Sequence, residues 1–390
     1  MKNIGKIGSP GRCKVVIQKY FPLAPIVLAL AACEPPETAP PASGAAPADE
    51  TILTEEAAEA AVVEVPPAIV TARDALSDRI ETIAEDFGGS LGIAVVDVET
   101  GWSTGHAAEK LFPQQSVSKT WVVLTALQQI DDGELSLDRQ VTLTRDDLAV
   151  FFQPIRSEIL ASGSLTTDVA DLIERAITQS DNTANDALLN IVGGPDAVRA
   201  TIADKNLGQI RFGPGERAMQ SQIAGVEWRQ SYAFTRDGFY EARDRVPNDV
   251  RRAAFERYLS NPVDGASPQA IARAYAALAR GELLSETGTA YFIAALERTK
   301  SGPRRIKAGA PSGWRVAHKT GTGQFFEGRQ SGYNDVGLVT APDGSAYAIA
   351  VMIGETSRAT IERMTMMQAV TRAVAQFHEE TQVLPESAES

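Results

Sequence analysis

The chain has 390 residues, of which 37 are Lys or Arg, 50 are Asp or Glu, three are His and two are Cys, so its formal charge is −13. An acidic chain has no basic surface to neutralise phosphates, which argues against a nucleic-acid partner. Two cysteines cannot build a disulfide framework or a four-thiolate zinc site. The composition, 44% apolar and 22% charged, is that of a globular protein that can bury a sizeable core.

The amino terminus is basic and then apolar. The first 33 residues contain five cations and no acid, and residues 21–32 form an apolar run. The run is too short to span a bilayer stably, so it predicts a secretory signal peptide. It ends in Leu-Ala-Ala-Cys33, which resembles the bacterial lipobox, whose cysteine is lipidated. We expect an exported protein on the periplasmic side, tethered through Cys33; the alternatives are a secreted protein with an incidental cysteine or an uncleaved anchor.

Residues 34–70 predict a linker. They contain seven prolines, eight acids and no base. Such a segment buries too little apolar area to offset its conformational entropy, and its charges repel one another. It should be extended, and its negative charge leaves the acyl chains as the membrane anchor.

Residues 71–385 predict one catalytic domain. Apolar residues recur at helical spacing over 72–87, and strand patterns follow at 91–98 and after the turn 99–102. The later elements are helices at 120–132, 167–179, 195–204 and 268–281, strands at 314–320, 335–340 and 346–353, and a helix over 361–377. This order predicts an α/β (α+β) fold: an antiparallel sheet of about five strands flanked by the N- and C-terminal helices, with an inserted all-helical domain. The sheet subdomain would comprise residues 71–112 and 306–380, and the helical subdomain residues 113–305.

Three short motifs occur in order along this domain. They are Ser116-Val117-Ser118-Lys119, Ser180-Asp181-Asn182 and Lys319-Thr320-Gly321. Singly they are weak signals. The first opens a predicted helix, the second ends one and the third lies on a predicted strand, so each falls where the structure would make it useful.

The residue types in these motifs suit nucleophilic catalysis. A serine at a helix start has its hydroxyl near inward-pointing N–H groups, which makes Ser116 a candidate nucleophile. Lys119 follows one helical turn later on the same face, close enough to take the hydroxyl proton. It can do so only when neutral, and burial beside a second cation such as Lys319 lowers an amine's pKa. Lys319 and Thr320 offer a cation and a hydroxyl to a substrate carboxylate, and the N–H groups of Ser116 and Thr322 could form an oxyanion hole.

Together the motifs resemble those of the penicillin-recognising serine acyltransferases, in particular the class A β-lactamases. The resemblance covers about residues 71–380, including the phrases 113–120, 179–185, 281–284 and 313–321. It implies that Ser116 is acylated, that Lys119 is its proton partner and that Ser180 relays the proton to the leaving lactam nitrogen. It also implies that Asn182 binds the substrate's amide side chain and that Lys319-Thr320-Gly321 holds its carboxylate.

The resemblance further implies a carboxylate that activates water for hydrolysis of the acyl-enzyme. Glu216 lies 36 residues after Ser180, about the family spacing, and Gln220 follows at i+4, where the family's usual Asn helps to hold that water. Pro214 replaces the family's Arg, so the usual ionic latch to the loop's closing residue, Asp264, is missing. A solvated loop acid is the alternative for Glu216, and Glu256 is the less favoured substitute.

The loop after Glu216 is long. It has about 35 residues more than a typical class A enzyme, an insert at about 221–260, and long loops in compact domains are usually functional lids or disordered. The insert is rich in arginine and contains Trp228, Tyr232, Phe234, Phe239, Tyr240 and Phe255. This aromatic content favours an ordered flap that packs beside the site and alters substrate choice.

An arginine and the three histidines are further candidates for the site. Family members place an Arg near the carboxylate pocket, either on the strand after the Lys-Thr-Gly motif or at the start of the last helix. Arg358, at the second place, is the better candidate; the alternative is that it is an ordinary surface arginine. The three histidines offer a Ser-His-Asp triad as an alternative. However, His106 and His378 have no motif around them, and the side chain of His318 should lie on the opposite face of the strand from that of Lys319. A triad and a histidine metal site are both disfavoured.

The sequence therefore predicts a class A type serine β-lactamase, a monomer that needs no metal or cofactor and acts on small β-lactams. Ser116 forms the acyl-enzyme, and water activated by Glu216 releases the product. A cell-wall D,D-peptidase or esterase with the same Ser-Lys site is the first alternative, and Glu216 argues against it because such peptidases generally lack a dedicated deacylating carboxylate. A β-lactam-binding protein that acylates and stops is the second.

Overall fold

The computed structural model describes residues 65–382. The predicted signal peptide, the lipidation site Cys33 and most of the predicted linker lie outside the described residues. Helix α1 (Pro67–Phe87) begins earlier than predicted, so residues 67–70 are helical rather than part of the linker. Proline at the first helical position explains the early start, because its missing N–H would have no helical partner there and its φ already suits a helix. Among the described residues, no helix is long and apolar enough to cross a membrane.

A five-stranded antiparallel sheet forms the centre of this unit, in the order β2-β1-β11-β10-β7. Its strands are β1 (Ser90–Asp97), β2 (Ser103–His106), β7 (Arg315–Thr322), β10 (Tyr333–Thr340) and β11 (Ala346–Glu355). Two strands come from the start of the described chain and three from its end, so the predicted fold class is confirmed. Strand β7 lies at one edge, where only β10 pairs with it.

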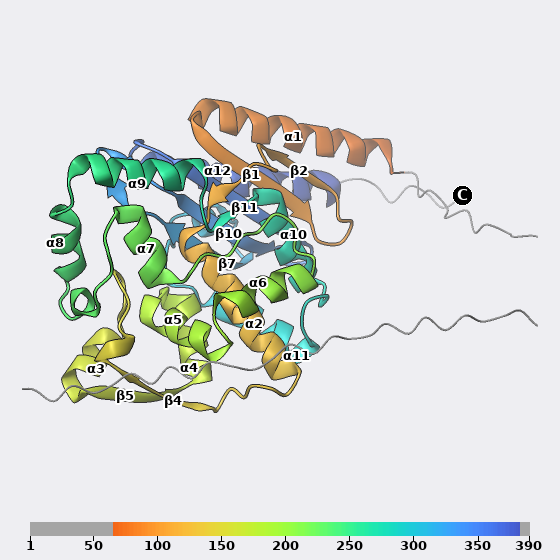
Figure 1. Cartoon of the computed structure of the whole chain (residues 1–390). Coiled ribbons are helices and arrows are strands. Elements are labelled where there is room, and N and C mark those ends of the chain that lie inside the picture. The colour runs from red at the N-terminus through yellow and green to blue at the C-terminus, as the bar shows by residue number, and fades with distance from the viewer. Residues whose placement is uncertain (1–64, 383–390) are drawn as a thin grey trace, which may run out of the picture. The chain divides into compact units, whose positions relative to one another are not determined.

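Helices α1 and α12 (Thr360–Gln382) cover one face of the sheet (Figure 1). Leu76 and Ile80 of α1 and Met367 and Val370 of α12 are buried in the same cluster as Ile349 of the central strand β11. These residues repeat every three or four positions along each helix, which is the spacing that places an apolar stripe on one side. The two ends of the described chain are thereby packed together.

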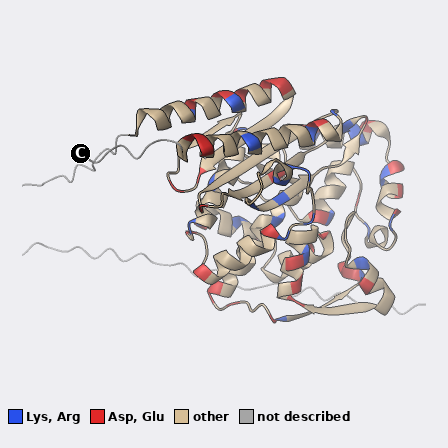
Figure 2. Ribbon diagram, turned by 180° about the vertical axis from the view of Figure 1, so that it is seen from behind, with Lys and Arg blue, Asp and Glu red and all other residues tan. Residues whose placement is uncertain are grey.

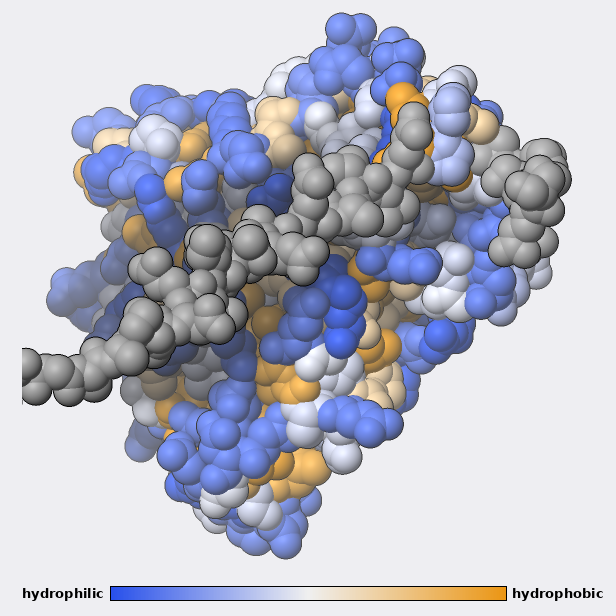
Figure 3. All heavy atoms as spheres, turned by 90° about the vertical axis from the view of Figure 1, so that its right-hand side faces the viewer, coloured by the Kyte–Doolittle hydropathy of each residue, from blue (hydrophilic) through white to orange (hydrophobic). Residues whose placement is uncertain are grey.

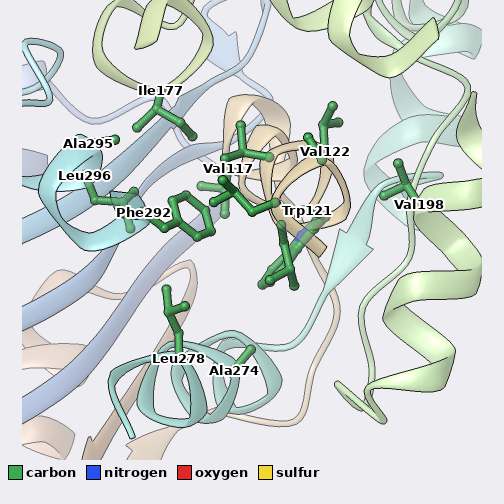
Figure 4. Packing of buried hydrophobic residues seen from close by; sticks show 14 of the residues in the cluster. Val117, Trp121, Val122, Ile177, Val198, Ala274, Leu278, Phe292, Ala295 and Leu296 are labelled. Atoms are coloured by element: carbon green, nitrogen blue, oxygen red, sulfur yellow. The ribbon is translucent and has the colours of Figure 1, made fainter. Parts of the chain in front are cut away.

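The other face of the sheet carries the segment between β2 and β7. Its principal helices are α2 (Lys119–Asp131), α3 (Arg156–Ser162), α4 (Val169–Glu174), α5 (Asn182–Ile191), α6 (Pro195–Asp204), α10 (Pro268–Ala279) and α11 (Glu286–Glu297). Helix α2 is central, and its residues 119–127 are all buried. Figure 4 shows Val117 and Trp121 in the same core cluster as Phe292 of α11. The segment that holds the nucleophile motif is therefore fixed by packing on several sides.

This segment is not all helical, contrary to the prediction. It contains the hairpin strands β4 (Gln140–Thr144) and β5 (Ser164–Asp168) and the short strands β3 (Phe112–Pro113) and β6 (Gly265–Ala266). The predicted helix 167–179 begins only at Val169, because Asp168 is its N-cap and accepts a 2.9 Å hydrogen bond from the Asp171 N–H. The preceding threonines are β-branched and favour the extended chain.

The insert is ordered into helices. Helix α7 (Glu216–Ala224) leads into it, and its own helices are η4 (Gln230–Ala233), α8 (Gly238–Asp244) and α9 (Asn248–Ser260), with α8 and α9 at the left of Figure 1. Helix α9 packs on the hairpin of β8 (Phe325–Phe326) and β9 (Arg329–Gln330), where the Phe255 and Phe326 ring centroids are 5.8 Å apart. Ion pairs Arg252–Glu327 and Arg329–Glu256 join the same two elements. The hairpin directly follows β7, so the insert is docked close to the edge strand.

Charged residues of both signs are interspersed along the helices (Figure 2). Several pair across elements, such as Arg298 with Glu174 at 2.6 Å and Arg315 with Glu297 at 3.0 Å. On the face drawn in Figure 3, hydrophobic residues lie among hydrophilic ones. Pairs at the surface contribute little to stability individually, so the fold depends mainly on the two buried clusters on either side of the sheet.

Candidate active site

Ser116 lies in a short 3₁₀ turn, η1 (Gln115–Ser118), that runs directly into α2. Lys119 is the first residue of α2 and is fully buried. Its Nζ donates a 3.0 Å hydrogen bond to Ser116 Oγ. The two residues are three positions apart, and the helical turn brings their side chains together as the spacing predicted.

Ser180 occupies a left-handed backbone conformation, with φ of 61°, where the helical turn η3 (Arg175–Gln179) ends. Asp181 caps the next helix, α5, and its carboxylate accepts hydrogen bonds from the N–H groups of Thr183 and Ala184 at 2.9 and 3.0 Å. The cap fixes the sharp turn that aims Ser180 at the site. Asn182 lines the same pocket, and its side-chain amide donates to the carbonyl of Val150 at 2.7 Å.

Strand β7 brings the third motif against the nucleophile turn. A Cβ atom on Gly321 would lie 2.3 Å from the carbonyl oxygen of Gln114, so only glycine allows this close approach. Lys319 Nζ donates to Ser180 Oγ at 3.0 Å, and Thr320 Oγ1 lies 2.6 Å from Ser301 Oγ. All three motifs thus meet at the edge strand.

Lys319 is fully buried. Burial lowers the pKa of its ammonium well below the ordinary value, and the nearby Lys119 lowers that pKa further. The nearby ammonium of Lys119 therefore disfavours the charge on Lys319. The converse effect, of Lys319 on Lys119, stays a prediction from the sequence.

Glu216 is the first residue of α7 and is 3% exposed. Its backbone N–H donates to the Asp186 carboxylate at 2.9 Å, which fixes the start of the helix. Its own carboxylate forms a buried ion pair with Lys119 and accepts a 3.2 Å hydrogen bond from the Gln220 side chain. Gln220 is held in turn by Gln324, whose amide donates to Gln220 Oε1 at 3.0 Å. The lysine that contacts the nucleophile therefore also contacts the candidate deacylating carboxylate.

A tyrosine from the insert occupies the place of the missing ionic latch. Asp264 is fully buried, and Tyr258 of α9 donates its hydroxyl to the Asp264 carboxylate at 3.0 Å. The same carboxylate accepts a 2.7 Å hydrogen bond from the backbone N–H of Gln115, the residue before the nucleophile. Gln115 has a φ of 54° and its side chain donates to the Tyr258 hydroxyl at 2.6 Å. Burial raises the pKa of Asp264 to about 6.

These residues surround a cavity of about 460 Å³. It is lined by Ser116, Phe151, Phe152, Gln179, Ser180, Asn182, Glu216, Gln220, Lys300, Ser301, Arg305, Thr320 and Thr322. The two residues expected to supply the oxyanion hole, Ser116 and Thr322, are both on its wall. A larger hollow of about 650 Å³ beside α10 contains none of the three motifs, so chemistry rather than size identifies the site.

Known proteins resemble this chain in sequence and in fold. A family model described as the beta-lactamase enzyme family matches residues 75–378. The chain belongs to this family. Beta-lactamase VEB-1 of Pseudomonas aeruginosa is 25% identical over 283 residues, 72% of this chain and 83% of the relative. A β-lactamase structure from Chitinophaga pinensis is 25% identical with a TM-score of 0.63, covering 78% of this chain and 98% of the other.

The relatives also identify the class. A structure of a variant of the last common ancestor of Gram-negative class A β-lactamases is 28% identical, has a TM-score of 0.61, and covers 78% of this chain and 99% of its own. The predicted resemblance to class A is therefore confirmed. Within this family the cavity at Ser116 is the candidate β-lactamase active site.

The structure does not bring Arg358 to this cavity. Its guanidinium lies 4.9 Å from the ring centroid of Phe87, and it lines a separate groove between α1 and α12. Arg305 lines the active-site cavity instead, although neither sequence position considered for the arginine included it. It donates to Thr322 Oγ1 at 2.6 Å and to the carbonyl of Gly321 at 3.1 Å. The signal available in the sequence was only its place shortly before β7.

The histidines and Glu256 are held elsewhere. His318 is fully buried and pairs with Asp335 at 2.8 Å, and His106 and His378 pair with Glu81 and Tyr347. The cavity-lining residues include no histidine and no Glu256. Among residues 65–382 no group of three or more His, Cys, Asp or Glu side chains could hold a metal ion.

Proposed function

We propose that this protein is an exported class A serine β-lactamase that opens penicillin- and cephalosporin-type lactams through an acyl-enzyme on Ser116. One observation carries the proposal. Lys119 Nζ contacts both Ser116 Oγ, at 3.0 Å, and the Glu216 carboxylate. The nucleophile, its proton partner and the Glu216 carboxylate are thus joined in one chain of contacts, as a two-step hydrolysis requires.

In the acylation step, Ser116 Oγ attacks the lactam carbonyl carbon and its proton passes to Lys119. Lys119 accepts that proton as a neutral amine, and its buried contact with Glu216 holds its side chain beside Ser116. The N–H groups of Ser116 and Thr322 would stabilise the oxyanion. The carbon–nitrogen bond of the lactam then breaks. Ser180 passes its proton to the departing nitrogen and takes the proton that Lys119 received from Ser116.

In the deacylation step, Glu216 takes a proton from a water molecule, and the resulting hydroxide attacks the ester carbon. The ester bond to Ser116 breaks, Ser116 regains a proton from Glu216 and the opened acid leaves. Gln220 lies 3.2 Å from the Glu216 carboxylate and would help to position the water. Lys319, Thr320 and Arg305 would bind the substrate carboxylate, and Asn182 its amide side chain.

A chromogenic cephalosporin followed beyond one equivalent tests the proposal. Sustained hydrolysis by the purified protein is expected, and the Ser116→Ala variant should show neither hydrolysis nor a covalent adduct by mass spectrometry. A stoichiometric burst that leaves a stable adduct would contradict a β-lactamase and support a binding protein. Hydrolysis of D-Ala-D-Ala peptides with no turnover of lactams would support the peptidase alternative.

The proposed tether is separate from the catalysis. Cys33 follows the apolar run and precedes the acidic, proline-rich segment, and we propose that its diacylated form anchors the enzyme on the periplasmic side. Radiolabelled palmitate should be incorporated into the full chain and not into a Cys33→Ser variant. Recovery of both proteins in the periplasmic fraction without label would contradict the lipid anchor.

A further inference from the structure

A second hollow lies beside the active-site cavity. Its volume is about 400 Å³, and it shares Phe151, Gln220 and Thr322 with the cavity at Ser116. Its remaining lining comes from two elements: Tyr240 and Arg243 of α8, and residues 323–325 after β7. Helix α8 belongs to the insert, so this wall is an addition to the site rather than part of the three catalytic motifs.

The hollow has aromatic walls with exposed surface. Phe325 is 56% exposed and Tyr240 is 39% exposed. The Phe151 ring meets Phe239 edge-on at 5.0 Å and lies 5.3 Å from Tyr240. Phe151 has a φ of 61°, an unfavourable backbone conformation for a bulky residue. The Phe151 ring connects the active site to the insert, and its contacts there retain the unfavourable conformation. The aromatic wall is therefore a specific feature of the fold.

The same wall carries excess positive charge. Arg243 stacks over Tyr240, with 5.0 Å from its guanidinium carbon to the ring centroid. Its nearest acid is Asp244 at 3.4 Å, and the same oxygen of Asp244 also faces Arg251 at 3.5 Å. The neighbouring acids Glu241 and Glu327 pair with Arg245 and Arg252. One carboxylate therefore serves two guanidinium groups, and Arg243 can attract an anion in the hollow.

We infer that this hollow binds the acyl side chain of the lactam and favours side chains that combine an aromatic ring with a carboxylate. The inference rests on the proposed function. The ring would contact Tyr240, Phe325 and Phe151, and the carboxylate would pair with Arg243. Arg243 is thereby a specificity-determining residue, and α8 is the part of the insert that selects substrate.

Two penicillins that differ by one carboxylate test the inference. Benzylpenicillin has a phenylacetyl side chain, and carbenicillin carries an additional carboxylate on the same side chain. The Arg243→Gln variant should lower the ratio of kcat/KM for carbenicillin to that for benzylpenicillin about 10-fold, chiefly through KM, because partly exposed charge pairs act mainly on binding. Arg243→Lys should restore much of the ratio. Raising the salt concentration should reduce the ratio in the parent protein and not in Arg243→Gln.

Arg245→Gln is the matched control. Arg245 lies on the insert two residues later, pairs with Glu241 and has a side chain that is 74% exposed; its loss should leave both penicillins within twofold. Tyr240→Ser should raise KM for both penicillins relative to 6-aminopenicillanic acid, which has no acyl group to fill the hollow. An unchanged ratio in a folded Arg243→Gln variant would overturn the subsite while leaving the β-lactamase assignment intact. Failure of the parent protein to hydrolyse any of the three compounds would overturn the proposed function instead.

Discussion

The two sides of the active-site cavity are held in different ways. Ser116, Lys119 and Ser180 lie in tight turns and helix starts; Lys119 donates a hydrogen bond to Ser116, and Lys319 of β7 donates one to Ser180. Glu216 is held by contacts with distant segments: its N–H bonds to α5, and its neighbour Gln220 bonds to Gln324 beyond β7. Acylation thus depends on short motifs, whereas deacylation depends on how the long loop folds. The loop can accept an insert because its catalytic residues are fixed from outside it.

The largest effect that separates the two sides is expected from Glu216→Ala. The change should leave acylation of Ser116 in place and slow hydrolysis of the ester by about 10³-fold, within the range of a lost general base. A chromogenic cephalosporin should then give one equivalent of product, and mass spectrometry should find the adduct on Ser116. Glu256→Ala is the control, because Glu256 pairs with Arg329 away from the cavity.

Loss of the stoichiometric burst in Glu216→Ala would contradict the division of the site into an acylation side and a deacylation side. It would mean that the contact between Glu216 and Lys119 is needed for acylation as well. The two sides would then act as one proton-transfer unit. Steady hydrolysis after the substitution would instead remove Glu216 from the deacylation step.

The contacts within short motifs could be predicted from the sequence, and those that depend on the path of the long loop could not. The spacing of Ser116 and Lys119 fixed their contact because both lie within one helical turn, and the apolar periodicities gave the sheet and its covering helices. The Tyr258 latch could not be predicted, since it joins α9 to Asp264 and Gln115 through the path of the insert. The absence of the family arginine at Pro214 signalled only that something else had to take its place.

Arg305 shows the same limit on the acylation side. It reaches the cavity because the chain before β7 folds back along the edge strand, where the guanidinium bonds to Thr322 and lies 3.8 Å from the ring centroid of Tyr333. No periodic pattern encodes this placement. Arg358 was predicted from family positions, and packing on Phe87 takes it elsewhere.

The next effect concerns pH and the latch. Burial raises the Asp264 pKa from 3.8 to about 6, so the folded protein holds this proton more tightly than the unfolded chain does. The stability contributed by the proton is fully present below the unfolded pKa and is lost as pH rises through the folded pKa. Between these values the free energy of unfolding should fall by about 3 kcal/mol on account of Asp264. Urea unfolding at several pH values should show this fall in the parent protein and a flatter profile in Asp264→Asn; parallel profiles would contradict it.

Arg305→Ala should lower kcat/KM by about 10-fold, mainly through KM, because a charge-assisted contact to the substrate carboxylate is lost. Arg358→Ala is the matched control and should remain within twofold of the parent. Steady-state kinetics with benzylpenicillin compares the two. An equal loss in both variants would mean that Arg358 reaches the substrate after all. The acylation side would then extend beyond the cavity at Ser116.

The smallest effect tests whether the insert supports the nucleophile. Tyr258→Phe removes the hydroxyl that donates to Asp264 and accepts from Gln115, which should lower the free energy of unfolding by about 1 kcal/mol. Because that hydroxyl favours the charged carboxylate, its loss should also raise the pKa of Asp264 and move the pH-dependent fall in stability to higher pH. Tyr232→Phe is the control, since its ring packs on Trp228 and phenylalanine keeps that contact. If Tyr258→Phe lowers stability without moving the pH profile, the hydroxyl acts through Gln115 and does not set the charge of Asp264. If the profile moves, the insert sets the charge of the residue that fixes the nucleophile turn.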